Sequence, residues 1–159
     1  GRLTYQPKIA QNIQYANEIF NKAIKKHQYE GSYTYAYCTK SSHFRFVMEE
    51  ALANGAHVET SSAFDIPIVR SLYKNKKLTK EHYIICNGFK RPLYLKHVSE
   101  LINDGFKNCL PVLDNLNELD YYEAHVKGNY QLAIRLAADE EPNFAFYTSR
   151  LGIRYDDVV

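Results

Sequence analysis

The sequence predicts an α/β fold in which parallel strands alternate with helices, arranged as part of a (β/α)8 barrel. Three observations lead to this prediction. Strand-like runs and helical patterns alternate from residue 31 onward. Each connection between strands is long enough to hold a helix, as parallel strands require. A polar residue stands at the end of each strand, and in a barrel these ends meet on one face. A doubly wound open sheet is the alternative, but it would not bring all five ends together.

Residues 1–30 are predicted to form a helical segment that precedes the barrel units in residues 31–159. The helix begins after Pro7 and ends before Gly31. Its apolar residues recur at helical spacing and are Ile9, Ile13, Ile19, Phe20 and Ile24.

The first strand, 33–39, carries its tyrosines on one face and smaller residues on the other. The tyrosine face suits packing against helices. The opposite face, which includes Ala36 and Cys38, leads to Lys40 immediately before a polar turn. A lysine at a barrel mouth above small neighbours can be partly desolvated and act as a nucleophile toward a carbonyl group. An ordinary solvated lysine that closes the strand is the alternative.

The rest of the chain repeats the same unit. Helices are expected over 43–54, 63–73, 92–102 and 116–124, and strands over 57–60, 83–86, 109–113 and 132–137. Asn54-Gly55 and Asp104-Gly105 provide the helix ends. Five strands fall short of a complete barrel, which takes roughly 250 residues. The sequence therefore predicts the first five or so units of a barrel.

The polar residues that could take part in binding or catalysis lie at the strand ends. They are Lys40, Glu59 with Ser61 and Ser62, Asn87, Asp114 and Arg135. Arg135 shares its face of the last strand with Ala133 and Ala137, so two cations surround a space suited to a bulky anion. An ion pair of Arg135 with Glu59 or Asp114 is the alternative explanation.

Composition excludes several classes of function. The net charge is only +2 and no basic stretch stands out, so nucleic acid and anionic membranes are not expected partners. No signal peptide and no long apolar run is found. The cysteines Cys38, Cys86 and Cys109 lack metal-ligand spacing, which favours reduced thiols in a cytoplasmic protein, with Cys38 and Cys86 in core strands. No glycine-rich dinucleotide or P-loop motif follows any strand.

An ordered set of motifs resembles the pyridoxal-phosphate decarboxylases of alanine racemase-like fold (fold type III), and most closely the biosynthetic arginine decarboxylases. The motifs are Tyr37–Lys40, Glu59–Asp65, Asn87–Tyr94, Pro111–Leu119, Ile134–Leu136 and Ser149–Gly152. The last is similar to the Ser-Lys-Phe-Gly motif of that group, with Arg150 and Leu151 in place of lysine and phenylalanine. The resemblance extends over most of the chain after residue 31.

The resemblance implies roles for individual residues. Lys40 would hold pyridoxal 5'-phosphate as a Schiff base and would be the catalytic residue. Glu59 would lie beside the cofactor, and Arg135 would contact the side of its ring. Ser61 and Asn87 would line the pocket. No metal ligand is expected in this chain, although the resemblance allows for a magnesium ion in full-length members.

The implied reaction is decarboxylation of a basic amino acid, most closely arginine to agmatine in polyamine and spermidine biosynthesis. The full-length protein would be a cytoplasmic homo-oligomer. Since the later cofactor-binding parts are not found in this sequence, the chain is expected to be an N-terminal fragment that is inactive alone. It is also expected to present an open sheet edge after the fifth strand. The alternative is a non-catalytic decarboxylase-like barrel that binds a protein partner.

Overall fold

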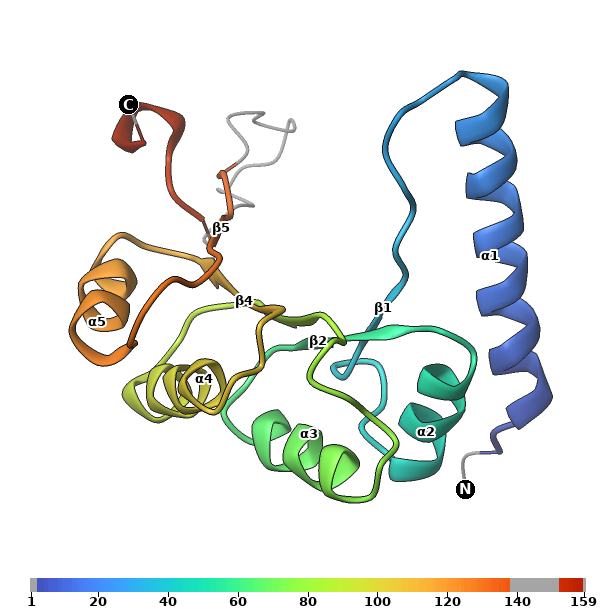
Figure 1. The fold of residues 1–159 in the computed structure, drawn as a ribbon, viewed down its shortest axis with the longest axis horizontal. Helices are drawn as coiled ribbons and strands as arrows, with labels where there is room; N and C mark the ends of the chain where they lie inside the picture. Colours follow the sequence, from blue (N-terminus) through green and yellow to red (C-terminus); the bar gives the residue numbers. More distant parts are fainter. Residues whose placement is uncertain (1–2, 138–151, 159) are drawn as a thin grey trace, which may run out of the picture.

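The computed structural model describes residues 3–137 and 152–158, and its centre is a five-stranded parallel sheet in the order β1-β2-β3-β4-β5 (Figure 1). The strands are β1 (Ala36–Cys38), β2 (His57–Thr60), β3 (Ile84–Cys86), β4 (Cys109–Leu113) and β5 (Ala133–Ile134). Every neighbouring pair is parallel. The predicted α/β fold, consistent with part of a TIM barrel, is confirmed.

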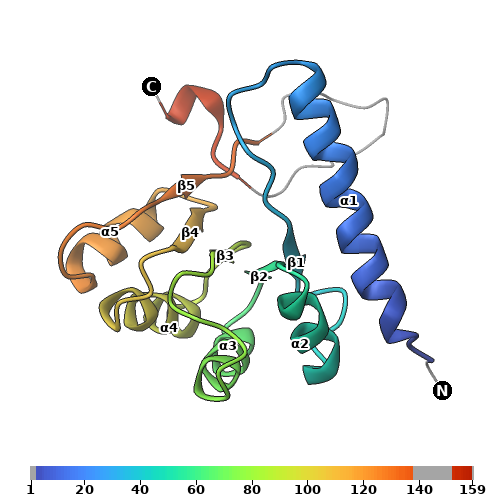
Figure 2. The ribbon, with the colours of Figure 1, turned by 45° about the vertical axis from the view of Figure 1, so that its right-hand side comes forward.

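Helices connect the strands and lie along one side of the curved sheet (Figures 1 and 2). They are α2 (Arg45–Ala53), α3 (Asp65–Lys74), α4 (Pro92–Asn103) and α5 (Asn117–His125). The first helix, α1 (Gln6–Lys26), stands beside α2, and a short 3-10 helix, η1 (Tyr155–Asp157), lies near the C-terminus. No helix in residues 3–137 and 152–158 is both long and apolar enough to cross a membrane.

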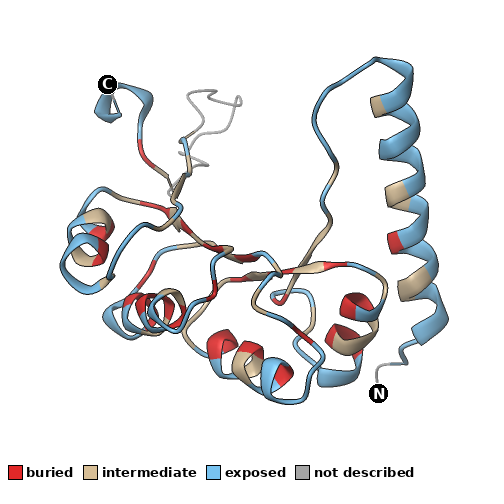
Figure 3. Ribbon diagram, in the orientation of Figure 1, coloured by how far each residue is buried: buried red, intermediate tan, exposed pale blue. Residues whose placement is uncertain are grey.

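The core lies between the sheet and helices α2–α5, as Figure 3 shows by the buried residues on the strands and on the helix sides facing them. Alternate strand residues enter this core. Val58 and Thr60 of β2 are buried, for example, whereas Glu59 between them is half-buried and faces the opposite, inner side of the sheet. The alternation therefore separates an apolar layer under the helices from a more polar inner face.

The tyrosines before and within β1 pack against helices, as expected. Tyr35 and Tyr37 contact the small cluster built around Ile13, which joins α1 to α2. Tyr33 stacks on Phe20 of α1, with ring centroids 4.1 Å apart. These contacts anchor the long first helix to the strand that leads to Lys40.

The sheet continues past β5 for one more residue. Leu136 forms an isolated parallel bridge with Ile153, which is 4% exposed and belongs to the core. Within the described residues β5 is the outermost strand of the sheet, as expected, and this bridge meets the chain at one position just beyond it. The remainder of the Ser149–Gly152 motif lies outside the described residues.

Candidate active site at the carboxyl ends of the strands

Lys40 lies in the turn directly after β1, at the carboxyl end of the sheet, and its side chain is exposed. The turn is fixed by two hydrogen bonds. The amide of Ser41 donates to the carbonyl of Cys38 at 3.1 Å. The Tyr37 hydroxyl donates to the carbonyl of Ser42 at 2.9 Å. The turn thus holds the predicted lysine on the rim, with its side chain exposed to solvent.

Glu59 and Asn87, both predicted as site residues, are in direct contact. The Asn87 amide Nδ2 donates to Glu59 Oε1 at 3.1 Å. The Cys38 thiol approaches the same carboxylate oxygen at 3.8 Å, since Cys38 and Glu59 are paired in register. The inner-face ends of β1, β2 and β3 therefore meet at one carboxylate.

Asn87 is held at both ends of its side-chain amide. Its Oδ1 accepts a hydrogen bond from the amide of Gly88 at 2.8 Å, while its Nδ2 reaches Glu59. Its own backbone amide donates to the carbonyl of Thr60 at 2.9 Å. Gly88 has a φ of +82°, a conformation open to glycine and strained for most other residues. The turn after β3 therefore fixes the orientation of the Asn87 side chain.

Ser61 lies in the loop between β2 and α3, where its contacts are made by the backbone. Its amide donates to Asp65 Oδ2 at 3.0 Å, as does the amide of Ser62. The Ser62 hydroxyl adds a third bond to the same oxygen at 3.1 Å. Asp65 itself is only 7% exposed. These hydrogen bonds fix the conformation of the loop beside Glu59. They involve the backbone amide of Ser61 and not its hydroxyl group.

Arg135 is half-buried just after β5. Its amide donates to the carbonyl of Leu113 at 3.0 Å, and its carbonyl accepts from the amide of Ile153 at 2.7 Å. Because Ala133 pairs with Val112 of the inner face, strand alternation assigns Arg135 to that face as well. In the part of the chain that the structure describes, Arg135 forms no ion pair with Glu59 or Asp114.

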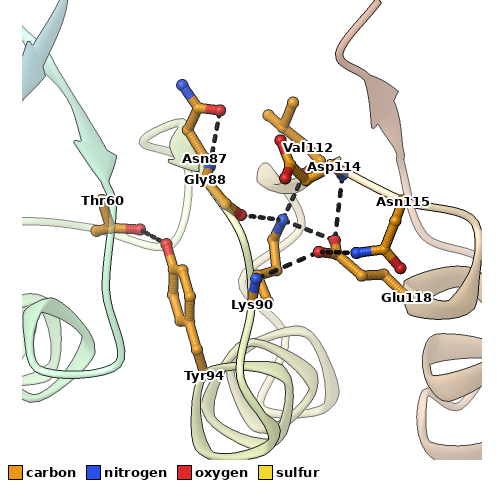
Figure 4. Close-up of polar contacts among 9 residues, drawn as sticks. All are labelled: Thr60, Asn87, Gly88, Lys90, Tyr94, Val112, Asp114, Asn115 and Glu118. Carbon is orange, nitrogen blue, oxygen red and sulfur yellow. Dashed lines mark hydrogen bonds and ion pairs between the residues drawn. The ribbon is translucent and has the colours of Figure 1, made fainter. Parts of the chain in front are cut away.

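A buried ion pair that the sequence analysis missed lies next to this site (Figure 4). Lys90 Nζ is 2.9 Å from Glu118 Oε2, and the two side chains are 0% and 2% exposed. The ammonium also donates to the carbonyls of Gly88, at 3.0 Å, and Val112. Its three N–H groups thus have three acceptors, which satisfies a cation that would otherwise be costly to bury.

Glu118 holds the loop that follows β4. Its Oε1 accepts from the backbone amide of Lys90 and from Asn115 Nδ2, both at 3.2 Å. Its Oε2 also accepts from the amide of Asp114 at 3.4 Å. Asp114, a predicted strand-end residue, is buried, and its Oδ1 has no hydrogen-bond partner among residues 3–137 and 152–158. The pair therefore ties the loop after β3 to the loop after β4.

Two signals in the sequence point to this pair. Lys90 and Glu118 each follow the end of a strand by a few residues, and the two strands are consecutive in the predicted order. Neighbouring parallel strands bring such positions together on one rim. Each residue also lies inside a motif of the resemblance, Lys90 in Asn87–Tyr94 and Glu118 in Pro111–Leu119.

Behind the sheet, Cys86 and Cys109 are buried as free thiols with their sulfur atoms 3.8 Å apart. The hydrogen bond between them lowers the pKa of Cys86 and, together with burial, raises the pKa of Cys109. The core thiols are thus Cys86 and Cys109. The placement of Cys38 in the core is wrong, since it lies half-buried on the inner face beside Glu59.

No group of three or more side chains suited to holding a metal ion occurs within the described ranges 3–137 and 152–158.

The fold and the rim define a class: a parallel α/β domain of TIM-barrel type whose polar residues gather at the carboxyl ends of its strands. Within that class, the chain is similar to the crystal structure of the biosynthetic arginine decarboxylase SpeA from Campylobacter jejuni, with a TM-score of 0.68 and 20% sequence identity. The match covers 96% of this chain and 24% of that chain. No protein-family model and no curated protein sequence matches. The chain therefore shares the fold of this part of a decarboxylase.

Proposed function

We propose that this chain supplies the lysine-bearing part of a pyridoxal-phosphate-dependent decarboxylase that acts on a basic amino acid, arginine foremost. One observation carries the proposal. In a fold shared with a biosynthetic arginine decarboxylase, an exposed lysine closes the first strand while the next two strands end at a hydrogen-bonded Glu59–Asn87 pair.

The residues present fit such a cofactor. Pyridoxal phosphate carries an aldehyde, an aromatic ring and a dianionic phosphate, so its site needs an amine, space and positive charge. Lys40 offers the amine, and Ala36 and Cys38 leave the inner face of β1 free of bulky side chains. Arg135, half-buried after β5, adds a cation on the same inner face.

When bound, the cofactor supplies an electron sink for the loss of carbon dioxide. The chain's own residues would hold and orient it. Lys40 Nζ would attach it covalently and would be released when the substrate amine takes its place. Glu59, oriented by Asn87, would present a carboxylate beside it. Arg135 would contact it from the opposite end of the row of strands. Ser61 and Asn87 would line the pocket.

We propose the complete decarboxylation reaction for the full-length protein and not for this chain alone. The chain spans 24% of the length of the similar decarboxylase chain, so we expect the 159 residues to be inactive by themselves. For the full-length protein we propose a cytoplasmic homo-oligomer that converts arginine to agmatine in polyamine biosynthesis.

The test begins with selective labelling. The chain is incubated with pyridoxal phosphate, reduced with borohydride and mapped by mass spectrometry. Lys40 should carry the adduct at concentrations that leave the exposed Lys107 and Lys127 unmodified. The variant Lys40→Ala should lose the adduct and its absorbance, whereas Lys127→Ala should keep both.

The full-length protein is then assayed for carbon dioxide release from arginine, with and without Lys40→Ala. Loss of activity in that variant agrees with the proposal. Equal labelling of all exposed lysines, or an active full-length Lys40→Ala variant, would contradict it. A folded full-length protein that neither binds the cofactor nor releases carbon dioxide would instead favour the non-catalytic barrel.

A further inference from the structure

We infer that Lys90 is a positioning residue for the candidate active site, and that its buried pair with Glu118 fixes the orientation of the Glu59 carboxylate. The inference rests on the proposed function only for its consequence in cofactor binding. Figure 4 shows the contacts from Glu118 through Lys90 and Gly88 to Asn87, and Asn87 in turn contacts Glu59 of β2.

The first step is the Lys90 ammonium. It donates to the carbonyl of Gly88 and is itself held by Glu118 Oε2 and the carbonyl of Val112. With all three donors used and no exposed surface, this amine has one available position. It therefore fixes the peptide that follows Gly88.

The second step is the turn itself. The amide of Gly88 donates to Asn87 Oδ1, so the residue whose carbonyl Lys90 holds also holds the Asn87 side chain. Asn87 Nδ2 then donates to Glu59 Oε1. The weaker contact of this carboxylate with the Cys38 thiol at 3.8 Å is its other side-chain hydrogen bond within residues 3–137 and 152–158. The direction of Glu59 thus depends on Asn87, and that of Asn87 on the turn held by Lys90.

A purely structural ion pair would stabilise the fold without affecting Glu59. The double variant Lys90→Met/Glu118→Met separates the two roles, because it removes both charges together. Replacing a whole buried pair by apolar residues is often close to neutral for stability, whereas removing one partner leaves a buried charge. The matched control is Lys96→Met/Glu100→Met, which removes an exposed pair on α4 with N···O 3.9 Å apart.

Two measurements are made on the complete 159-residue chain. The first follows solvent exchange of the Asn87 side-chain amide protons by NMR, with no cofactor present. The second is the apparent affinity for pyridoxal phosphate, read from absorbance and from borohydride labelling of Lys40. We expect faster exchange and an affinity loss of about fivefold in the Lys90/Glu118 variant, the scale of one hydrogen bond, and no change in the control.

A double-mutant cycle with Asn87→Ala supplies the decisive comparison. Asn87→Ala alone should weaken cofactor binding by a similar factor. Added to the Lys90/Glu118 variant, it should cost less affinity than it does in the wild-type background, because both changes interrupt the same series of contacts. Fully additive losses, or a folded Lys90/Glu118 variant with wild-type exchange and affinity, would overturn the inference.

The outcomes remain distinguishable from those of the proposed function. If wild-type Lys40 is not labelled, the proposed function fails, while the exchange measurement still tests whether Lys90 orients Asn87. If the methionine variant does not fold, Lys90→Met/Glu118→Gln replaces it, since the glutamine keeps an acceptor for the backbone amide of Lys90 while the Gly88 carbonyl still loses its donor. The same two readouts then decide.

Discussion

The backbone amide of Ile153 donates to the carbonyl of Arg135 at 2.7 Å, and the amide of Ala137 donates back to the carbonyl of Ile153 at 2.9 Å. These two bonds extend the parallel sheet beyond β5 with a residue from the following segment. They also bring the backbone of Gly152 against the segment after β5 that carries Arg135, the cation of the candidate site.

Gly152→Ala should destabilise the protein more than an alanine at another glycine of similar conformation. A Cβ at Gly152 would lie 2.9 Å from the Ala137 nitrogen and 2.9 Å from the Arg135 carbonyl oxygen, and φ is +102°. We expect a loss of about 2–4 kcal/mol in the free energy of unfolding, from strain and steric overlap together. Gly55→Ala is the control, because its φ of +82° is similar but nothing lies within 4 Å. Its loss should be about 1 kcal/mol. Equal losses by chemical denaturation would show that the close approach is absent.

Tyr94→Phe should remove a buried hydrogen bond between α4 and the end of β2. The Tyr94 hydroxyl lies 2.7 Å from Thr60 Oγ1, and both residues are buried. Thr60 Oγ1 also contacts the carbonyl of Ile85, at a longer distance of 3.5 Å. We expect the free energy of unfolding to fall by about 1–2 kcal/mol, measured by urea denaturation.

Tyr122→Phe also removes a buried tyrosine hydroxyl, but unlike Tyr94→Phe it should not lower the stability of the protein. The Tyr122 side chain is fully buried, and its hydroxyl has no hydrogen-bond partner within residues 3–137 and 152–158. Removing an unsatisfied buried hydroxyl should leave stability unchanged or raise it by up to about 1 kcal/mol. A loss as large as that of Tyr94→Phe would indicate a partner for this hydroxyl in solution.

Asp65→Ala should loosen the loop between β2 and α3. One carboxylate oxygen accepts from two backbone amides and the Ser62 hydroxyl, so alanine leaves these donors without an acceptor. We expect a loss of about 1–2 kcal/mol in the free energy of unfolding. Asp65→Asn keeps an acceptor oxygen and should recover at least half of that loss. No recovery would mean that charge, rather than the hydrogen bonds, stabilises the loop.

His57 should make stability depend on pH. Burial, and secondarily the nearby His82, lower the pKa of His57 below its ordinary value of 6.5. Its Nδ1 accepts a hydrogen bond from the amide of Tyr83 at 2.9 Å, which requires that nitrogen to be unprotonated. Above pH 6.5 the residue is neutral in both states and its contribution is complete. As the pH falls below this value, the unfolded chain binds the proton first and stability is lost.

Urea denaturation between pH 8 and pH 5 measures this loss. His57→Gln should flatten the decline on the acid side, since glutamine does not titrate. The control is His27→Gln, which makes the same substitution at an exposed position at the end of α1. Identical profiles for wild type and His57→Gln would contradict the assignment.

The predicted strand bounds agree best with the structure where the adjacent strands are long enough to pair along the whole predicted range. The predicted ranges 57–60 and 109–113 match β2 and β4. The first strand was predicted over 33–39, but β1 spans only Ala36–Cys38. It shortens because β2 begins at His57, opposite Ala36, and leaves the preceding tyrosines without a strand to pair with. Sequence alternation shows which residues can form a strand, whereas the neighbour decides which of them do.

The candidate site was predicted in part. Glu59 and Asn87 were each placed at strand ends, and the structure joins them by a hydrogen bond. The ion pair of Lys90 and Glu118 was not predicted, because each residue taken alone has the pattern of a solvated polar side chain near the start of a helix. Their burial results from the packing of two adjacent loops, which the local pattern of either loop does not contain. The roles of all five predicted site residues, Lys40, Glu59, Ser61, Asn87 and Arg135, remain predictions.

The sequential strand order has a consequence for how the protein is made. Each strand pairs only with the strands immediately before and after it in the chain, as far as the described residues extend. On a ribosome, β2 can therefore dock on β1, and β3 on β2, while later segments are still being synthesised. Each docking step closes a loop of similar, modest length, so no pairing has to wait for a distant part of the polypeptide.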